Sequence, residues 1–172
     1  MTQAQPITTE QQLRDTIAKP ENEHLEFKEA QRSFDDDKLL EYCAALANEC
    51  SGNLVLGVTD KQLRQIVGIN CFRSLNKIKR KILNELRFRV DVYEILVSEK
   101  RVLTFFCPPR PPGTPRQYRG RYLMRSGESL VSMTPEVLQR VFAEGVLDFS
   151  QTICEGAAIH TDLASEAIIE FR

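Results

Sequence analysis

The sequence has 172 residues, of which 42% are hydrophobic and 27% charged, so its length and composition suit one folded domain with a buried core. It contains no apolar run of the ~20 residues that a membrane span requires, and its first residues lack the character of a signal peptide. Five widely spaced cysteines without a CxxC pair disfavour a zinc ribbon and predict reduced thiols. We therefore expect a cytoplasmic protein with no membrane partner.

The net charge of −1 hides a strong asymmetry along the chain. Residues 61–125 hold sixteen lysines and arginines and four acids, whereas the remainder holds seven basic and twenty acidic residues. A one-sided distribution is typical of surfaces that bind polyanions. The alternative is that the opposite charges interleave in the folded chain and cancel, and the sequence leaves both open.

The hydrophobic pattern predicts alternating helices and strands. Thr9 and Gln12 have the spacing of a capping box, the acids at 35–37 favour a helix start, and Thr134 before Pro135 is a good N-cap. In chain order we expect a helix over 9–18, a strand over 24–29, a helix over 35–50 and a buried strand over 54–58. A strand at 66–69, a helix over 73–88 and a hairpin of strands over 90–97 and 101–106 follow. A proline-rich loop over 107–121 then leads to a strand over 122–126 and a helix from 135 to about 143. This pattern predicts an α+β fold, a mixed β-sheet with packed helices in a single domain.

The strand over 24–29 has one apolar and one polar face. Leu25 and Phe27 alternate with Glu26 and Lys28, so the first pair is expected in the core and the second on the side where chemistry takes place. A solvated strand edge with a weak surface ion pair is the alternative.

The helix over 73–88 combines an apolar stripe with a basic outer face. Lysine and arginine side chains on such a helix are suited to the sequence-independent contacts that a phosphate backbone offers. A solvated face neutralised by acids elsewhere is the alternative. The candidate contacts are Arg73, Lys77, Lys79, Arg80 and Lys81.

The proline-rich loop and the strand after it form a second basic stretch, with no acid between residues 100 and 127. Arginine binds phosphate in a bidentate manner, tyrosine stacks on unpaired bases, and a stiffened loop loses less entropy on binding. A self-association or partner-protein loop is the alternative. The candidates are Arg110, Arg116, Tyr118, Arg119, Arg121 and Arg125.

Several short motifs occur in a characteristic order: HLEFK, an AALAN helix, a glycine-bearing turn, LVLGV, Asp60, IVG and YLMRSGES. In this order they resemble the Schlafen/AlbA-type DNA-binding domain, from about Glu21 to about Ala143. That family usually has two glycines in the turn before LVLGV, where Ser51 here takes the place of the first. The resemblance implies the nucleic-acid-binding domain of a bacterial transcriptional-regulator or ATP-binding protein, with DNA or RNA as the partner.

The Schlafen branch of the family implies a different activity, a metal-dependent endoribonuclease that uses two glutamates and an aspartate. By position these fall on Glu21, Glu26 and Asp60, with Lys28 beside them, and they would hold Mg²⁺ or Mn²⁺. A third alternative is a non-enzymatic module that forms homo-oligomers by extending its sheet through the strands LVLGV and VYEILV.

These expectations divide the chain into three parts. Residues 1–20 form an N-terminal helix, residues 21–145 the Schlafen/AlbA-type domain, and residues 146–172 a tail. The helical pattern that begins near Asp162 stops at Arg172 without a terminator, so we expect the sequence to continue into a further domain in a longer protein.

Overall fold

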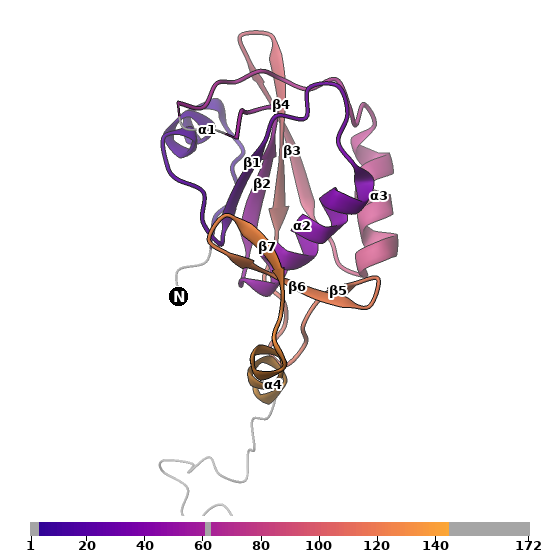
Figure 1. Cartoon of the computed structure of the whole chain (residues 1–172). Coiled ribbons are helices and arrows are strands. Elements are labelled where there is room, and N and C mark those ends of the chain that lie inside the picture. The colour runs from indigo at the N-terminus through magenta and orange to yellow at the C-terminus, as the bar shows by residue number, and fades with distance from the viewer. Residues whose placement is uncertain (1–3, 61–62, 145–172) are drawn as a thin grey trace, which may run out of the picture.

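A four-stranded mixed sheet lies at the centre of the structure, a computed structural model that describes residues 4–60 and 63–144 (Figure 1). The strand order is β1–β2–β4–β3. Strand β1 (Leu25–Lys28) runs parallel to β2 (Gly52–Leu56), and β4 (Lys100–Cys107) is antiparallel to both β2 and β3 (Asp91–Val97). The strands LVLGV and VYEILV, which were considered for extending the sheet between subunits, correspond to β2 and β3. Because β2 is paired on both sides, only β3 of these two lies at an edge of the sheet.

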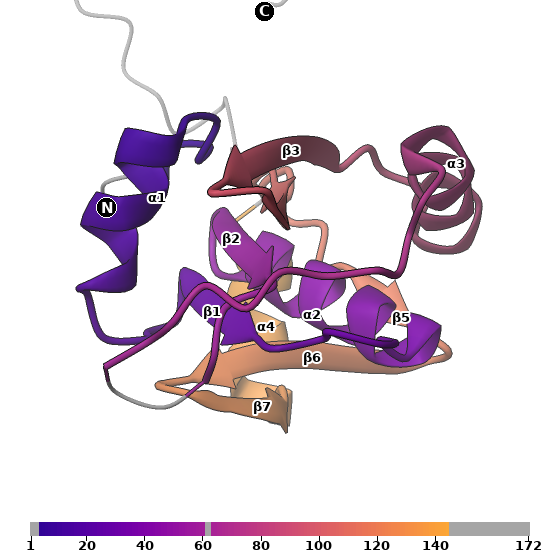
Figure 2. The ribbon, with the colours of Figure 1, turned by 90° about the horizontal axis from the view of Figure 1, so that it is seen from above.

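Helices cover both faces of this sheet. Helix α1 (Glu10–Ile17) lies on one face, and α2 (Asp36–Asn48) and α3 (Leu75–Leu86) lie on the other (Figure 2). The alternation along β2 divides the core accordingly, since Val55 packs toward α1 while Leu54 and Leu56 pack toward α2 and α3.

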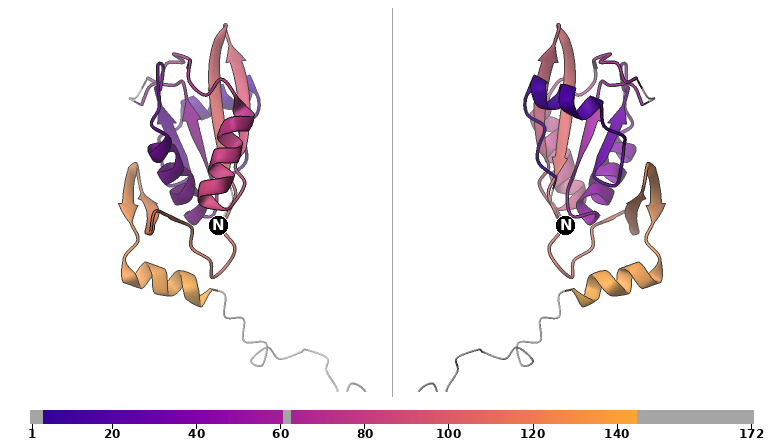
Figure 3. Two further views of the ribbon diagram at one scale, coloured as in Figure 1. Left: turned by 90° about the vertical axis from the view of Figure 1, so that its right-hand side faces the viewer. Right: turned by 90° about the vertical axis from the view of Figure 1, so that its left-hand side faces the viewer.

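A second, smaller antiparallel sheet covers the outer side of α2. Its order is β5–β6–β7, with bounds Gln117–Tyr118, Arg121–Ser126 and Ser129–Ser132. Helix α4 (Pro135–Ala143) follows and projects beside this sheet (Figure 3). The turn from β5 to β6 consists of Arg119 and Gly120, which both have positive φ, as a two-residue type I′ turn requires.

The α+β fold in a single domain is confirmed, and so are most of the elements that support it. Thr9 forms the expected capping box, because its side chain accepts from the backbone N–H of Gln12 and the Gln12 side chain accepts in return. The hairpin of β3 and β4 is closed by Ser98 and Glu99, both with positive φ.

The strand predicted at 66–69 is wrong. Ile66 forms only an isolated bridge with Val58. The carbonyl of Gly57 accepts from the backbone N–H of both Val67 and Gly68, and Gly68 has a φ of +77°, so the chain turns where a ladder would have to continue.

The second sheet also differs from expectation. Residues 117–118 were predicted as loop and residues 129–132 were given no element, yet both form strands because β6 lies between them as a shared partner. The helical pattern near Asp162 lies outside the described residues. No helix among residues 4–60 and 63–144 has the length and hydropathy that a membrane span requires.

Candidate nucleic-acid interface and the neighbouring charge cluster

Helix α3 presents an accessible basic face. Ser74 caps its N-terminus, and Ile78, Ile82 and Leu86 bury its apolar stripe against the sheet. The other sides of the helix carry cations. Arg73, Lys77, Lys79 and Arg80 are exposed, and Lys81 is half-buried.

Only one of these five cations has a carboxylate partner among the described residues. The ammonium of Lys81 forms a salt bridge with Asp36 at the start of α2. The other four have no acid within salt-bridge distance in residues 4–60 and 63–144. The face of α3 is therefore a patch of uncompensated positive charge.

The loop before β6 uses its cations differently, because they contact acids of α2. Arg119 forms a salt bridge with Asp37 at 2.5 Å, and Arg121 one with Glu41 at 2.9 Å. Both guanidinium groups are still largely accessible, with side chains 65% and 56% exposed. A phosphate would have to compete with these carboxylates for either group.

Tyr118 lies in the core and does not present its ring to solvent. It is 4% exposed, and its hydroxyl donates to Asp37 at 2.8 Å. This hydrogen bond lowers the pKa of Asp37, while burial and the same bond raise the pKa of Tyr118 to about 12. In this position the ring contributes to packing, and its predicted stacking on a base is not available.

Arg110 and Arg116 are also engaged within the chain. Arg110 is 9% exposed and binds Glu144 in a bidentate manner, at 2.6 and 2.8 Å. Arg116 lies over the ring of Phe88, with 4.8 Å between the guanidinium carbon and the ring centroid, and burial lowers its pKa.

Arg125 lies in the interior, beside Glu26. The strand β6 places Arg125 on the same face as the buried Leu123, and its guanidinium reaches across to the Glu26 carboxylate of β1. The two side chains are 0% and 1% exposed. Glu26 was expected on an open face; in the structure the second sheet covers it.

Glu26, Lys28 and Asp60 form one charge cluster at the ends of β1 and β2. The Lys28 ammonium lies 2.6 Å from Glu26 Oε1 and 3.2 Å from Asp60 Oδ2. Although burial alone would lower the pKa of Lys28, its contacts with Glu26 raise it. Asp60 also accepts the backbone N–H of Glu29 at 3.1 Å.

Glu21 lies at the margin of this cluster. The turn that its spacing from Glu26 requires is present at Asn22, which pairs with Leu25. Its carboxylate accepts the backbone N–H of Phe27 at 2.8 Å. Burial raises the pKa of Glu21, and the negative charge of Glu26 adds to this effect.

These donors do not fit a divalent cation as they are arranged. Both oxygens of Glu26 are engaged by cations, Lys28 on one side and Arg125 on the other, and Asp60 shares the same ammonium. Among the described residues, no three acid, histidine or cysteine side chains gather as metal ligands. The ammonium of Lys28 holds the position between Glu26 and Asp60 in which a metal ion would be expected.

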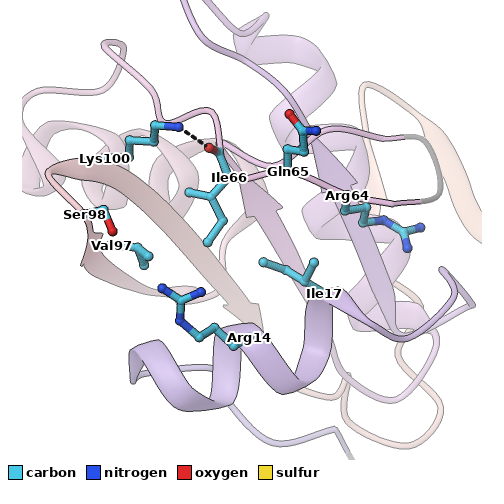
Figure 4. Close-up of a pocket in the computed structure, with 8 residues that line it drawn as sticks. All are labelled: Arg14, Ile17, Arg64, Gln65, Ile66, Val97, Ser98 and Lys100. Atoms are coloured by element: carbon cyan, nitrogen blue, oxygen red, sulfur yellow. Dashed lines mark hydrogen bonds between the residues drawn. The ribbon is translucent and has the colours of Figure 1, made fainter.

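Cations line several cavities of the described part of the chain. One, of about 450 Å³, lies between α1 and the β3–β4 hairpin and is lined by Arg14, Arg64 and Lys100 (Figure 4). Its cations are engaged, since Arg14 pairs with Glu10, Arg64 donates to the carbonyl of Lys19, and Lys100 donates to that of Ile66. A second cavity, of about 380 Å³, lies at the start of α3 beside Phe72, Arg73 and Lys77.

Two important residues were not singled out from the sequence. Asn48 connects the end of α2 to the loop and to β6, and Arg101 donates to the carbonyls of Cys71 and Phe72. A signal exists for Asn48, because its position continues the buried apolar stripe of α2, where a polar side chain requires partners. No comparable signal marks Arg101.

The family of the chain follows from its sequence. The chain belongs to the Schlafen AlbA_2 family, whose sequence profile matches residues 21–134, and the resemblance drawn from the short motifs is thereby confirmed. No curated protein matches the sequence.

Two solved structures are similar to this one. The crystal structure of the DIP2311 protein from Corynebacterium diphtheriae aligns with a TM-score of 0.54 at 23% identity, over 64% of this chain and 25% of that one. The solution structure of the N-terminal domain of a protein related to the DNA helicase RecG, from Nitrosomonas europaea, aligns with a TM-score of 0.48 at 20% identity, over 72% and 89%. The chain thus spans a quarter of the first protein, and that similarity extends to the fold alone.

Proposed function

We propose that this domain binds nucleic acid, DNA or RNA, through the basic face of α3, and that it serves as the nucleic-acid-binding part of a transcriptional regulator. One observation carries the proposal. Lys77, Lys79 and Arg80 on α3, together with Arg73 just before its N-cap, are exposed and have no carboxylate partner among the described residues, although the net charge of the chain is −1.

The physical reason is that such a patch is unfavourable without a ligand. Cations three or four residues apart on a helix, such as Lys77 and Arg80, lie close together and repel each other by a few tenths of a kcal/mol. A phosphate backbone relieves this repulsion, and the counterions that it releases provide free energy for binding. The family membership agrees with this function, since the resemblance is to a DNA-binding domain.

The proline-rich loop has a smaller part in this proposal than its composition predicts. Arg110 in the loop and Arg125 in β6 are buried and form salt bridges with Glu144 and Glu26, so they support the fold. Arg119 and Arg121 are accessible, but contact with phosphate would cost them their carboxylate partners. We therefore expect α3 to provide most of the electrostatic free energy of binding.

The test is the salt dependence of binding. We expect the quadruple variant Arg73→Ala/Lys77→Ala/Lys79→Ala/Arg80→Ala to bind a fluorescent 20-base-pair duplex roughly 100-fold more weakly than the wild type at 50 mM salt. The slope of log K against log salt should fall by about three to four, because each lost phosphate contact removes ~0.9. Fluorescence anisotropy between 50 and 300 mM NaCl measures both quantities.

Two controls separate α3 from the other basic elements. Lys19→Ala/Arg140→Ala removes two exposed cations far from α3, and it should leave the slope within about 0.5 of the wild type. Arg119→Ala/Arg121→Ala should lower it by less than one. An unchanged slope in the quadruple variant, or a larger loss in the loop variant, contradicts the assignment to α3.

The endoribonuclease alternative receives one supporting observation, which is that the fold brings Asp60 to Lys28 and Glu26. The charge of Glu26 is already balanced by Lys28 and Arg125, however, so we expect no metal-dependent cleavage. Labelled transfer RNA incubated with Mn²⁺ should remain equally intact with the wild type and with Asp60→Asn. Asp60 is suited to this test because it is exposed, so the substitution spares the core. Cleavage by the wild type that Asp60→Asn abolishes would establish the nuclease.

A further inference from the structure

The cavity at the start of α3 combines an apolar surface with cations. Its volume is about 380 Å³, within the ~300–1,000 Å³ of typical small-molecule sites. Phe72 and Ile78 form its apolar part, and three cations lie around them, Lys77 and Lys81 of α3 and Arg73 just before the helix. Ser74 and Asp36 complete the lining.

The backbone at Phe72 is held in an unusual conformation. Its φ is +52°, in the left-handed region, where a bulky side chain is strained. Arg101 stabilises this conformation, because its guanidinium donates to the carbonyls of Cys71 at 2.7 Å and of Phe72 at 2.9 Å. The guanidinium is itself fixed by Glu94, which accepts from its Nε at 2.6 Å.

The hydrogen bonds from Arg101 determine where the ring of Phe72 lies. The ring contacts Phe105 of β4 in a T-shaped arrangement, with 6.2 Å between the centroids and 75° between the planes. It also lines the cavity, and the residue is only partly buried. The chain thus retains a strained aromatic residue at the border between the core and an open hollow.

Two of the three cations of the cavity lie on one side of α3. Lys77 and Lys81 are spaced by four residues on the helix, whereas Arg73 lies just before the N-cap Ser74. Asp36 balances Lys81. Arg73 and Lys77 have no carboxylate partner in the described part of the chain, and they lie next to Phe72.

We propose that this cavity binds an unpaired nucleotide of the nucleic acid. The base lies against Phe72 and Ile78, and its phosphate lies at Arg73 and Lys77. The inference rests on the proposed function and adds a preference to it. A base that is paired and stacked in a continuous duplex cannot enter the cavity, whereas a base in a single strand stacks on an aromatic ring without regard to sequence.

The test compares one variant on two ligands, with the full chain. We expect Phe72→Leu to weaken binding of a fluorescent single-stranded 20-mer by about tenfold, since stacking on an aromatic ring is lost. Binding of the blunt duplex of the same sequence should change less than about twofold. Phe72→Tyr keeps the ring and should retain single-strand binding. Lys79→Ala/Arg80→Ala lies outside the cavity and should weaken both ligands by a similar factor.

A cross-link on the wild-type protein makes the result independent of how well the variants fold. A single strand that contains 4-thiothymidine should, after irradiation, be attached to a peptide that contains Phe72, which mass spectrometry identifies. Equal effects of Phe72→Leu on both ligands, or cross-links confined to other segments, overturn the cavity as a nucleotide site. Either result leaves the proposed function standing as long as Lys79→Ala/Arg80→Ala weakens binding. If neither the α3 variants nor Phe72→Leu weakens binding, both the nucleotide site and the proposed function are overturned.

Discussion

Replacing Glu26 with glutamine is expected to destabilise the protein more than replacing Arg125 with methionine, although the two side chains form one ion pair. Without Arg125, the Glu26 carboxylate keeps its contact with Lys28 at 2.6 Å. Without the Glu26 charge, the guanidinium of Arg125 stays fully buried, and its Nε and one Nη already lack hydrogen-bond partners. A buried cation without a counter-charge is strongly unfavourable.

The expected losses in the free energy of unfolding are about 3–5 kcal/mol for Glu26→Gln and about 2 kcal/mol for Arg125→Met. Urea denaturation followed by circular dichroism measures both. Lys38→Ala removes an exposed lysine whose partner Glu41 keeps its salt bridge with Arg121, so as the matched control it should cost less than about 0.5 kcal/mol. Equal losses for the two core variants, or a larger loss for Arg125→Met, would show that the pair is not asymmetric.

Replacing Asn48 with alanine is expected to cost about 3 kcal/mol. The side chain makes three hydrogen bonds at the end of α2. Its Nδ2 donates to the carbonyls of Arg116 and Leu123, at 2.9 and 2.8 Å, and its Oδ1 accepts the backbone N–H of Arg116 at 2.7 Å. Alanine leaves these backbone groups without a partner, at about 1 kcal/mol or more for each. Thermal or urea unfolding measures the loss.

Two further variants show whether the hydrogen bonds are responsible. Asn48→Asp has nearly the same shape but cannot donate to the two carbonyls, so its loss should be as large as that of the alanine variant. Asn84→Ala removes an exposed asparagine of α3 and should cost less than about 1 kcal/mol. Hydrogen exchange in β6 should accelerate in both Asn48 variants, since this residue attaches the strand to α2. Stability close to that of the wild type in Asn48→Asp would refute this role.

Local patterns were sufficient to predict most helices and strands. The Thr9 cap, the helical stripe of α3 and the hairpin of β3 and β4 depend on residues close in sequence, and they are present as predicted. The strands β5 and β7 could not be predicted in this way, because each is short and depends on β6 as its partner. The composition of a segment does not contain that information.

The candidate site, like the fold, could be predicted from the sequence only in part. The exposure of Lys77, Lys79 and Arg80 on α3 follows from helical periodicity alone, whereas the partners of the arginines in the loop and in β6 do not. Arg119 contacts Asp37 and Arg125 contacts Glu26 across more than 80 residues of sequence, and only the three-dimensional fold brings them together. One clue was present, since alternation in β6 places Arg125 on the same face as Leu123 and therefore inside.

The way in which the second sheet is attached has a consequence for its behaviour in acid. Apart from the hydrogen bond of Asn48 to Leu123, the side-chain links of this sheet to the rest of the chain end on carboxylates, which are those of Glu23, Glu26, Asp37, Glu41 and Glu49. The pKa values of Asp37 and Glu23 are lowered by the hydrogen bonds they accept, from Tyr118 and from backbone N–H groups. Their contribution to stability is therefore complete at neutral pH and disappears as the pH falls through these lowered values. We therefore expect acidification to loosen this sheet before the larger one, whose ladder of backbone hydrogen bonds does not titrate.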